Sequence, residues 1–219
     1  MILEISTFKH PDIVHGFTLK DVSFGFIKWT YSNFKVYDLK QIHSDIVLEA
    51  GRAKKGDALI TSEPGKILVI KTADCLPLLF HEPEARIIGA AHAGWRGLAK
   101  GILLKVVEKM KGKGADLRKL RVAIGPAIGP CCYEVGEEVF EAFEKNEMPY
   151  VRKGKNLDLF ETAIRQLKEA GLERDNIHLL PLCTYCNEIF FPSFRRERVL
   201  SSQILSFIGL IKKGKKNKI

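Results

Sequence analysis

The 219-residue sequence lacks the features that mark secreted, membrane or fibrous proteins. No apolar run approaches the roughly 20 residues that a bilayer-spanning helix needs. The first segment, MILEISTFKHPDIVHGF, carries charges within its first ten positions and has no apolar stretch of the secretory kind. No repeat, low-complexity tract or Pro/Ser-rich linker divides the chain. These absences predict a single cytoplasmic domain that does not insert into a membrane.

Cysteine is scarce, and its pattern argues against a disulfide framework. The five cysteines are odd in number, and two are adjacent: Cys75, Cys131, Cys132, Cys183 and Cys186. In a reducing compartment, metal ligation, catalysis or burial explains such residues better than cross-links. A zinc ribbon would need a second pair at suitable spacing from the Cys-x-x-Cys motif, which Cys131 and Cys132 do not supply. We therefore expect a non-metal role for Cys183 and Cys186.

Positive charge is concentrated at one end of the chain. The formal net charge is +9, and the segment at 211–219, IKKGKKNKI, contributes five lysines and no acid. Without those five lysines the net charge of residues 1–210 is +4. We expect one domain at 1–210 followed by a solvated basic tail at 211–219. The remaining positive charge favours an anionic small substrate over nucleic acid as partner.

Short apolar runs alternate with amphipathic segments. Runs bounded by Gly, Pro, Asp or Lys predict strands at 25–29, 46–49, 58–61, 67–72, 76–80, 87–93, 120–124 and 177–180. Helical periodicity predicts helices at 95–111, 136–146 and 157–170. This alternation favours an α/β (or α+β) fold, a single three-layer domain with a mixed β-sheet flanked by helices.

Two of the expected strands lie next to residues that can bind a metal. The run LVIKTADCLPLLF carries Cys75, and the run IIGAAHAGWRG carries His92. A third segment, QIHSDIV, offers His43. One thiolate and two imidazoles suit a zinc ion that keeps its fourth position open for water or substrate. If these three residues meet in space, the chain is a metal-dependent enzyme.

Polar and aromatic residues accompany these candidate ligands. Asp74 precedes Cys75 in an otherwise apolar context. Pro77 cannot donate to a strand ladder, so we expect a break or bulge that points the polar pair into a cleft. Trp95 could pack over a ring, and Arg96 could pair bidentately with a carboxylate or phosphate.

Three other segments contribute candidate substrate contacts. The two Gly-Pro turns of AIGPAIGPCCYEVG predict a loop that walls a pocket, with Tyr133 and Glu134 at the start of the next helix. Gln41 could face the same site across a turn. Arg195 and Arg196 could bind an anion, although a solvated charge run explains them equally well.

The ordered segments QIHSDIV, GDALIT, TADCLPLLF, AAHAGWRG, IGPCCYEVG and CTYCNEIFFPSFRR resemble the laccase-domain family, also called polyphenol oxidases or multicopper-oxidase-like purine nucleoside phosphorylases. The resemblance extends from His15 to about Ile208. It implies an α/β/α-type domain whose zinc ligands are His43, Cys75 and His92. It also implies phosphorolysis of adenosine, inosine, guanosine and methylthioadenosine, with adenosine deamination at the same site. Copper-dependent oxidation is a further activity assigned to the family.

This resemblance leads to a hypothesis with named roles. Zn²⁺ would activate water for deamination, and Asp74, or else Glu134, would move protons. For phosphorolysis, phosphate and a purine nucleoside are the expected partners, with Arg96, together with Arg195 or Arg196, steering the phosphate.

Rival functions use the same residues or the tail. One is a cysteine hydrolase with Cys75 as nucleophile and His92 as base. An amidase that removes wrong amino acids from cell-wall precursors and a copper polyphenol oxidase are others, although six histidines are few for multi-copper chemistry. A basic binding module relying on the lysine tail is the non-enzymatic alternative.

Two positions depart from the family pattern. Ser44 stands where a glycine usually follows the histidine of the first motif, which predicts an altered turn. The segment 200–202, Leu-Ser-Ser, stands where Thr-Gly-Arg is expected, which predicts one anion-binding arginine fewer and a changed substrate range.

Overall fold

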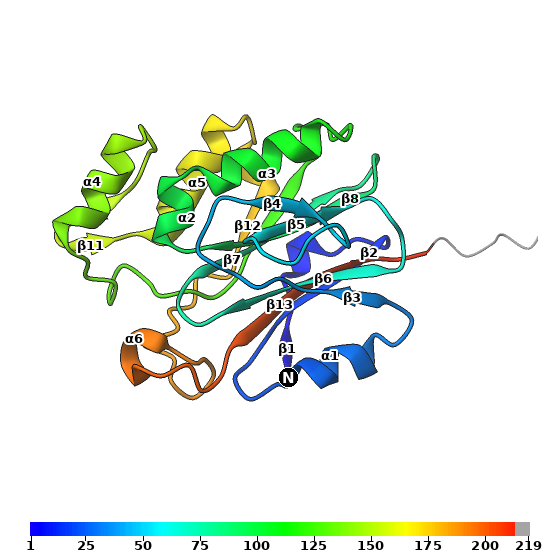
Figure 1. The fold of residues 1–219 in the computed structure, drawn as a ribbon, viewed down its shortest axis with the longest axis horizontal. Coiled ribbons are helices and arrows are strands. Elements are labelled where there is room, and N and C mark those ends of the chain that lie inside the picture. Colours follow the sequence, from blue (N-terminus) through cyan, green and yellow to red (C-terminus); the bar gives the residue numbers. More distant parts are fainter. Residues whose placement is uncertain (213–219) are drawn as a thin grey trace, which may run out of the picture.

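Two stacked β-sheets form the centre of the protein, with helices on their outer faces (Figure 1). The computed structural model describes residues 1–212. One sheet has six strands in the order β12-β9-β7-β8-β5-β4, and the other has five in the order β1-β2-β13-β6-β3. Beyond Lys212, the expected basic tail lies outside the described residues.

The strands, including one small hairpin, are β1 Ile2–Leu3, β2 Ile13–Thr18, β3 Lys35–Tyr37, β4 Val47–Glu49, β5 Ala58–Thr61, β6 Lys66–Thr72, β7 Leu76–Glu82, β8 Ile87–Ala93, β9 Arg121–Ile124, β10 Arg152–Lys153, β11 Asn156–Leu157, β12 Ile177–Leu179 and β13 Ile204–Leu210. The α-helices are α1 Phe24–Thr30, α2 Trp95–Ala99, α3 Ile102–Lys111, α4 Glu137–Lys145, α5 Leu159–Glu169 and α6 Phe194–Glu197. Short 3-10 turns occur at Ser6–Phe8 and Arg174–Asn176.

Both sheets are mixed, which confirms the expected α/β class. In the six-stranded sheet, β7 is antiparallel to β8 and β9, whereas β9 is parallel to β12. The structure contains a second sheet in addition to the one that we expected. This second sheet covers one face of the central strands, and the helices cover the other. In β7, Leu78 and Phe80 face the helices, and Leu79 faces the five-stranded sheet. Strands covered on both sides read as continuous apolar runs, so the sequence pattern did not reveal two sheets.

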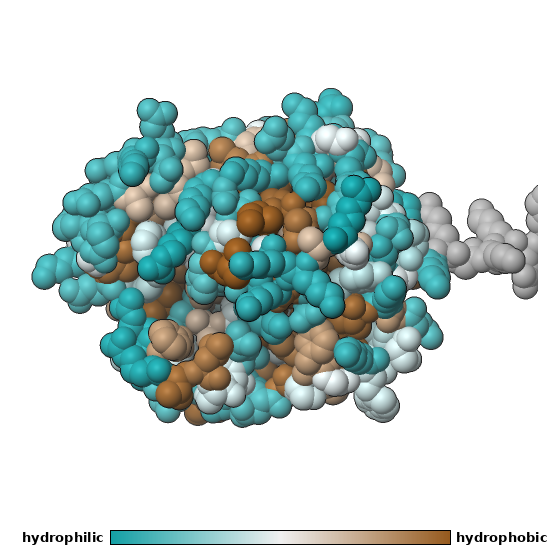
Figure 2. Space-filling view, viewed as in Figure 1, coloured by the Kyte–Doolittle hydropathy of each residue, from teal (hydrophilic) through white to brown (hydrophobic). Residues whose placement is uncertain are grey.

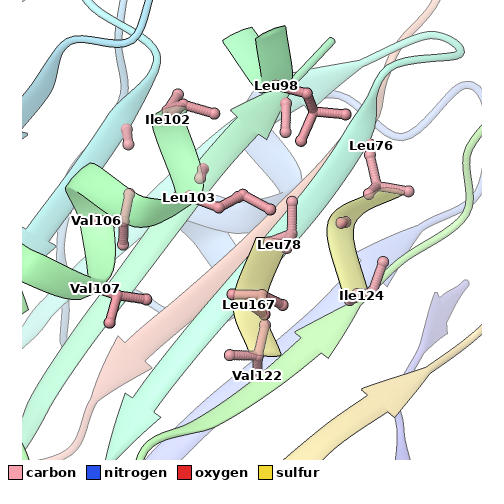
Figure 3. Packing of buried hydrophobic residues seen from close by; sticks show 14 of the residues in the cluster. Leu76, Leu78, Leu98, Ile102, Leu103, Val106, Val107, Val122, Ile124 and Leu167 are labelled. Atoms are coloured by element: carbon pink, nitrogen blue, oxygen red, sulfur yellow. The ribbon is translucent and has the colours of Figure 1, made fainter. Parts of the chain in front are cut away.

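The largest hydrophobic cluster lies between the six-stranded sheet and the helices above it. Leu103 and Val106 of α3 and Leu167 of α5 point toward Leu78 of β7 and Val122 of β9 (Figure 3). Each such side chain, when fully buried, contributes roughly 1.5–3 kcal/mol. This cluster holds the sheet rigid beneath the loops that leave its edge.

Several expected elements are confirmed, and three expectations are wrong. Residues 25–29 belong to helix α1, because Ser23 caps it by accepting a hydrogen bond from the Phe26 backbone N–H. The helix expected at 95–111 is broken into α2 and α3 by Gly101, whose φ is +73°. Pro77 does not break β7. It occupies the second position, opposite His92, before the pairing with β9 begins, so the strand loses little from its missing donor.

The visible surface is mostly hydrophilic (Figure 2). Hydrophobic side chains gather over the segment around α6, where Phe190, Phe194 and Leu200 are exposed. Among residues 1–212, the helices are all too short or too polar to cross a membrane.

One buried histidine makes the fold sensitive to acid. His81 of β7 is fully buried, and neither of its ring nitrogens has a hydrogen-bond partner among the described residues. Burial, followed by the positive charges of His10 and Arg121, lowers the pKa of His81 to about 3, although Asp12 acts in the opposite direction. The folded protein therefore keeps this ring neutral, whereas the unfolded chain protonates it near its ordinary pKa of 6.5.

We expect the His81→Leu variant to lose less stability in acid than the unsubstituted protein. Since the unfolded state binds the additional proton, the contribution of His81 is present above pH 6.5 and is lost as pH falls toward the folded pKa of about 3. Between pH 6.5 and about pH 5 the loss is on the order of 2 kcal/mol. Urea denaturation at several pH values measures it. Parallel pH profiles for the two proteins would contradict the assignment.

Candidate metal centre

One edge of the six-stranded sheet collects the residues expected to bind a metal. Strand β7 begins there and the antiparallel β8 ends there, so the turn that carries Cys75 lies beside His92. His43 reaches the same edge from the loop between β3 and β4. The potential ligand atoms of these three residues all lie within 4.8 Å of one another. The predicted meeting of His43, Cys75 and His92 is therefore confirmed.

The spacing of the three side chains fits a tetrahedral ion. Cys75 Sγ lies 3.9 Å from His43 Nε2. The rings of His43 and His92 are 4.8 Å apart and nearly perpendicular, at 82°. Sulfur and nitrogen ligands at ordinary zinc bond lengths stand about 3.5 Å apart, so small side-chain adjustments suffice. Three protein ligands leave one position open, which is the pattern of catalytic rather than structural zinc.

A buried carboxylate, that of Asp57, organises the centre. Asp57 is fully buried just before β5, and its Oδ1 lies 2.8 Å from His92 Nδ1. It also accepts the backbone N–H groups of Ile42, His43 and Ser44, and the Ser44 hydroxyl at 2.6 Å. Because the carboxylate accepts a hydrogen bond from the Nδ1–H group of His92, Nε2 is left to bind a metal. The same bonds hold the backbone of His43 at φ +56°.

Opposite charges reinforce one another in this cluster. Burial opposes ionisation of Asp57, but hydrogen bonds from His92 and Ser44 outweigh it and lower the pKa of Asp57 to about 2. Burial alone would lower the pKa of His92, yet Cys75 and Asp57 raise it to about 9. For Cys75, His92 and His43 overcome burial and lower the pKa of the thiol to about 6. The environment thus favours the thiolate, which is the form that binds metals.

The role of Asp57 was not predicted from the sequence. The only signal was its place in GDALIT, an acid directly before a fully buried strand. Ser44, which we expected to alter the turn, instead adds a hydroxyl donor to Asp57. The other departure, Ser202, accepts a hydrogen bond from the backbone N–H of Asp21.

Asp74 lies beside Cys75 but is tied to the protein. Its Oδ1 accepts the Thr184 hydroxyl at 2.7 Å, and its Oδ2 accepts the Arg195 backbone N–H at 2.7 Å. The Asp74 backbone adopts φ +87°, and its carbonyl accepts the N–H of Ile128. These bonds favour a positioning role over the proton transfer expected from the sequence.

Gln41 and Arg196 are also held by backbone groups. The Gln41 amide pairs with both the carbonyl and the N–H of Lys71 in β6. Arg196 donates to the carbonyls of Thr184, Tyr185 and Phe191. Both geometries favour positioning of loops over the expected contacts with substrate.

Of the residues predicted to contact substrate, two arginines and two aromatic residues remain as candidates. The Arg96 guanidinium stacks on the Trp95 ring at 4.3 Å, and that of Arg195 lies 5.1 Å from the centre of the Tyr133 ring. Burial raises the pKa of the Tyr133 hydroxyl, and the charge of Cys75 adds to this effect while Arg195 opposes it. Tyr133 is therefore in electrostatic range of the centre.

Glu134, next to Tyr133, is exposed. Its carbonyl accepts a hydrogen bond from the Arg195 guanidinium. The carboxylate lies on a loop that is fixed to this arginine.

The fold and the site together define an α/β domain with a candidate metal centre. Two histidines and one cysteine form this centre and leave one coordination position open. The chain belongs to the family described as multi-copper polyphenol oxidoreductase laccase, whose family model matches residues 27–211. Its solved relatives share the fold. The crystal structure of YlmD from Geobacillus stearothermophilus has a TM-score of 0.84 and 28% identity, and the match covers 94% of each chain.

Relatives in sequence carry names of enzymes of nucleoside chemistry. Purine nucleoside phosphorylase YlmD from Geobacillus stearothermophilus is 38% identical over 70% of this chain and 59% of its own length. Purine nucleoside phosphorylase YfiH from Escherichia coli is 37% identical over 79% of this chain and 73% of its own. Adenosine deaminase RL5, from an unknown prokaryotic organism, is 36% identical over 72% and 62%. The sequence match thus spans less than two thirds of YlmD and RL5.

Gly94 is expected to be required for the geometry of the centre. A Cβ atom there would stand 2.8 Å from Cys75 Sγ and 3.3 Å from His43 Cδ2. We expect Gly94→Ala to weaken metal binding by at least about 10-fold, because two ligands must move. A competition titration against a chelator measures the affinity. Gly25→Ala is the control, since a Cβ at that position meets only Ser23 Oγ at 3.5 Å. Equal affinities for the two variants would contradict the steric argument.

Replacement of the Asp57 carboxylate should disturb both the centre and the fold. In Asp57→Asn, an amide N–H₂ would face groups that donate hydrogen bonds, so we expect a loss of about 3 kcal/mol in unfolding free energy. Metal affinity should fall roughly 10- to 100-fold. Ser44→Ala removes a single donor to the same carboxylate and should cost about 1 kcal/mol. Denaturant titrations and metal competition give the two readouts, and an Asp57→Asn protein as stable as Ser44→Ala would refute this role.

Proposed function

We propose that the protein is a zinc-dependent purine nucleoside phosphorylase with adenosine deaminase activity. Its substrates would be adenosine, inosine, guanosine and methylthioadenosine. The observation that carries this proposal is the convergence of His43, Cys75 and His92 on one point, with Asp57 holding His92 from behind. The names of the relatives supply the nucleoside chemistry.

The donor set supports zinc as the metal. Two imidazole nitrogens and one thiolate, with one open position, are a combination that catalytic zinc sites use. When bound, zinc would supply a positive charge that activates water or orients an anionic group. The same two-histidine, one-cysteine set can also accept copper, so metal analysis of the purified protein distinguishes the two.

Arg96 and Arg195 are proposed to bind phosphate. Both guanidiniums are anchored on aromatic rings close to the centre, and planar guanidinium groups bind phosphate oxygens bidentately. In phosphorolysis, a phosphate oxygen forms a bond to C1′ of the ribose as the bond from C1′ to the base breaks. The base leaves with the electron pair and takes a proton. Trp95 and Tyr133 offer ring faces against which a purine can stack.

Glu134 is proposed as the group that moves the proton. Asp74, the first candidate from sequence, uses both carboxylate oxygens to hold Thr184 and Arg195. Glu134 is exposed on the loop that Arg195 fixes. In deamination, the oxygen of water would form a bond to C6 of adenosine, ammonia would leave, and Glu134 would carry the proton to it.

A cysteine hydrolase is the second candidate, and one observation favours it. Cys75, His92 and Asp57 are lined up as a thiol, an imidazole and a carboxylate, which is the arrangement of a nucleophile, a base and an orienting group. In that case the protein would work without metal, and alkylation of Cys75 would inactivate it.

Product analysis by mass spectrometry tests the proposal. The protein should convert nucleosides to free base and ribose 1-phosphate only when phosphate is present, and adenosine to inosine without it. Cys75→Ala should abolish both reactions together with zinc binding at this centre, because it removes a ligand. Full turnover by a Cys75→Ala protein that binds no zinc at His43 and His92 would refute the zinc mechanism.

Glu134→Gln separates proton transfer from binding. We expect kcat to fall roughly 100-fold with little change in zinc content, since general acid–base catalysis contributes about 10²–10⁴-fold. Glu138→Gln, an exposed glutamate of the following helix α4, is the matched control. Equal kcat values for the two variants would rule out Glu134 as the proton carrier.

A further inference from the structure

A second group of potential metal ligands consists entirely of cysteines. Cys131, Cys132, Cys183 and Cys186 place their sulfurs within 4.8 Å of one another. Cys186 Sγ lies 3.6 Å from Cys131 Sγ and 3.3 Å from Cys132 Sγ. Together with Cys75, these residues account for all five cysteines of the chain. The group shares no residue with the candidate metal centre.

The parallel pairing of two strands brings these distant cysteines together. Strands β9 and β12 run parallel, and the chain continues from both in the same direction past their carboxyl ends. Beyond those ends, Ala127 and Cys183 form a parallel bridge, and the Thr184 N–H donates to the Ala127 carbonyl. The adjacent pair at 131–132 therefore meets the Cys-x-x-Cys motif. The spacing rule that made us expect a non-metal role applies to ligand pairs close in sequence, and it does not cover a group of cysteines that a sheet brings together.

The local geometry suits a tetrahedral metal thiolate. Sulfur ligands at a zinc–sulfur bond length of about 2.3 Å stand about 3.8 Å apart, close to the separations of Cys186 from Cys131 and Cys132. The Gly129 backbone N–H donates a hydrogen bond to Cys183 Sγ at 3.2 Å. Such N–H groups stabilise thiolate charge, as outer hydrogen bonds do around metal ligands.

Disulfides account for this arrangement less well. All five cysteines are free thiols, and Cys186 contacts both members of the adjacent pair. A disulfide of Cys186 with either one would divide the group into two pairs and leave Cys183 as the partner of the other. A metal ion engages all four sulfurs at once.

We propose that Cys131, Cys132, Cys183 and Cys186 form a second, structural zinc site. Four thiolates close the tetrahedron and leave no position for water or substrate, which is the pattern of structural zinc. Soft thiolate ligands select zinc or iron over magnesium and calcium. The ion would cross-link the loop after β9 to the segment after β12.

Short stretches of chain and one hydrogen bond would connect this cross-link to the candidate active site. Cys132 is followed directly by Tyr133 and Glu134. On the other side, Thr184 lies inside the Cys-x-x-Cys motif and bonds to Asp74, the neighbour of Cys75. The consequence for catalysis rests on the proposed function, whereas the zinc site itself does not.

Metal analysis of the unsubstituted protein and its variants tests the site without any activity assay. The unsubstituted protein, Cys75→Ala and Cys186→Ser are purified under reducing conditions, incubated with Zn²⁺, freed of excess ion and measured by inductively coupled plasma mass spectrometry. We expect about two zinc ions per chain in the first and about one in each variant. Tyr185→Phe, a change at an exposed residue inside the same motif, should leave the content unchanged.

Cobalt substitution identifies the ligands. In Cys75→Ala, only the four-cysteine site remains, so Co²⁺ should give the intense charge-transfer and visible bands of a tetrahedral tetrathiolate complex. Cys186→Ser should lose these bands. A Cys75→Ala protein that is folded by circular dichroism but binds neither Zn²⁺ nor Co²⁺ would overturn the proposal, as would equal zinc content in Cys186→Ser and the unsubstituted protein. Failure of the nucleoside assay alone would bear only on the proposed function.

Discussion

The interaction on which the candidate active site depends is the set of hydrogen bonds to the Asp57 carboxylate. A fully buried charge is strongly unfavourable unless donors surround it, and here the backbone of 42–44, the Ser44 hydroxyl and the His92 ring do so. These donors come from a loop and from a strand that the carboxylate thereby joins. Because the Asp57 carboxylate accepts hydrogen bonds from both the loop and the strand, it fixes the positions of His43 and His92 relative to each other.

The sheet supplies the second constraint. The register between β7 and β8 sets Pro77 opposite His92, which puts the Cys75 turn against Gly94, where no side chain larger than hydrogen fits without displacing a ligand. The start of β5, the ends of β8 and β9 and the start of β7 all lie along this edge. Rigid strands, buried on both faces, thus carry His92 directly and support the loops that carry His43 and Cys75. This division agrees with the general placement of function on loops above a packed scaffold.

The sequence predicted the parts of this site whose signal is local. Cys75 and His92 stand out as polar residues at the ends of apolar runs, and strands 58–61 and 87–93 were predicted with the observed bounds. Asp57 could not be assigned, since most of its partners are backbone N–H groups that leave no trace in the side-chain pattern. Strand β13 was missed, although it pairs with both β2 and β6 and completes the second sheet. Pairings across more than a hundred residues are set by tertiary packing, which a periodicity does not encode.

The two groups of potential ligands differ in composition, which suits one group to catalysis and the other to a structural role. A centre with two neutral nitrogen donors and one thiolate keeps a net positive charge when a divalent ion is bound, which attracts phosphate and polarises water. Four thiolates around the same ion carry a net negative charge and would repel phosphate, so the cysteine group suits a purely structural role. The Asp74–Thr184 bond then links the two, because it joins the turn before Cys75 to the Cys-x-x-Cys motif. A change in the cysteine group would therefore reach the candidate metal centre through this buried hydrogen bond and through the chain from Cys132 to Glu134, rather than through the core.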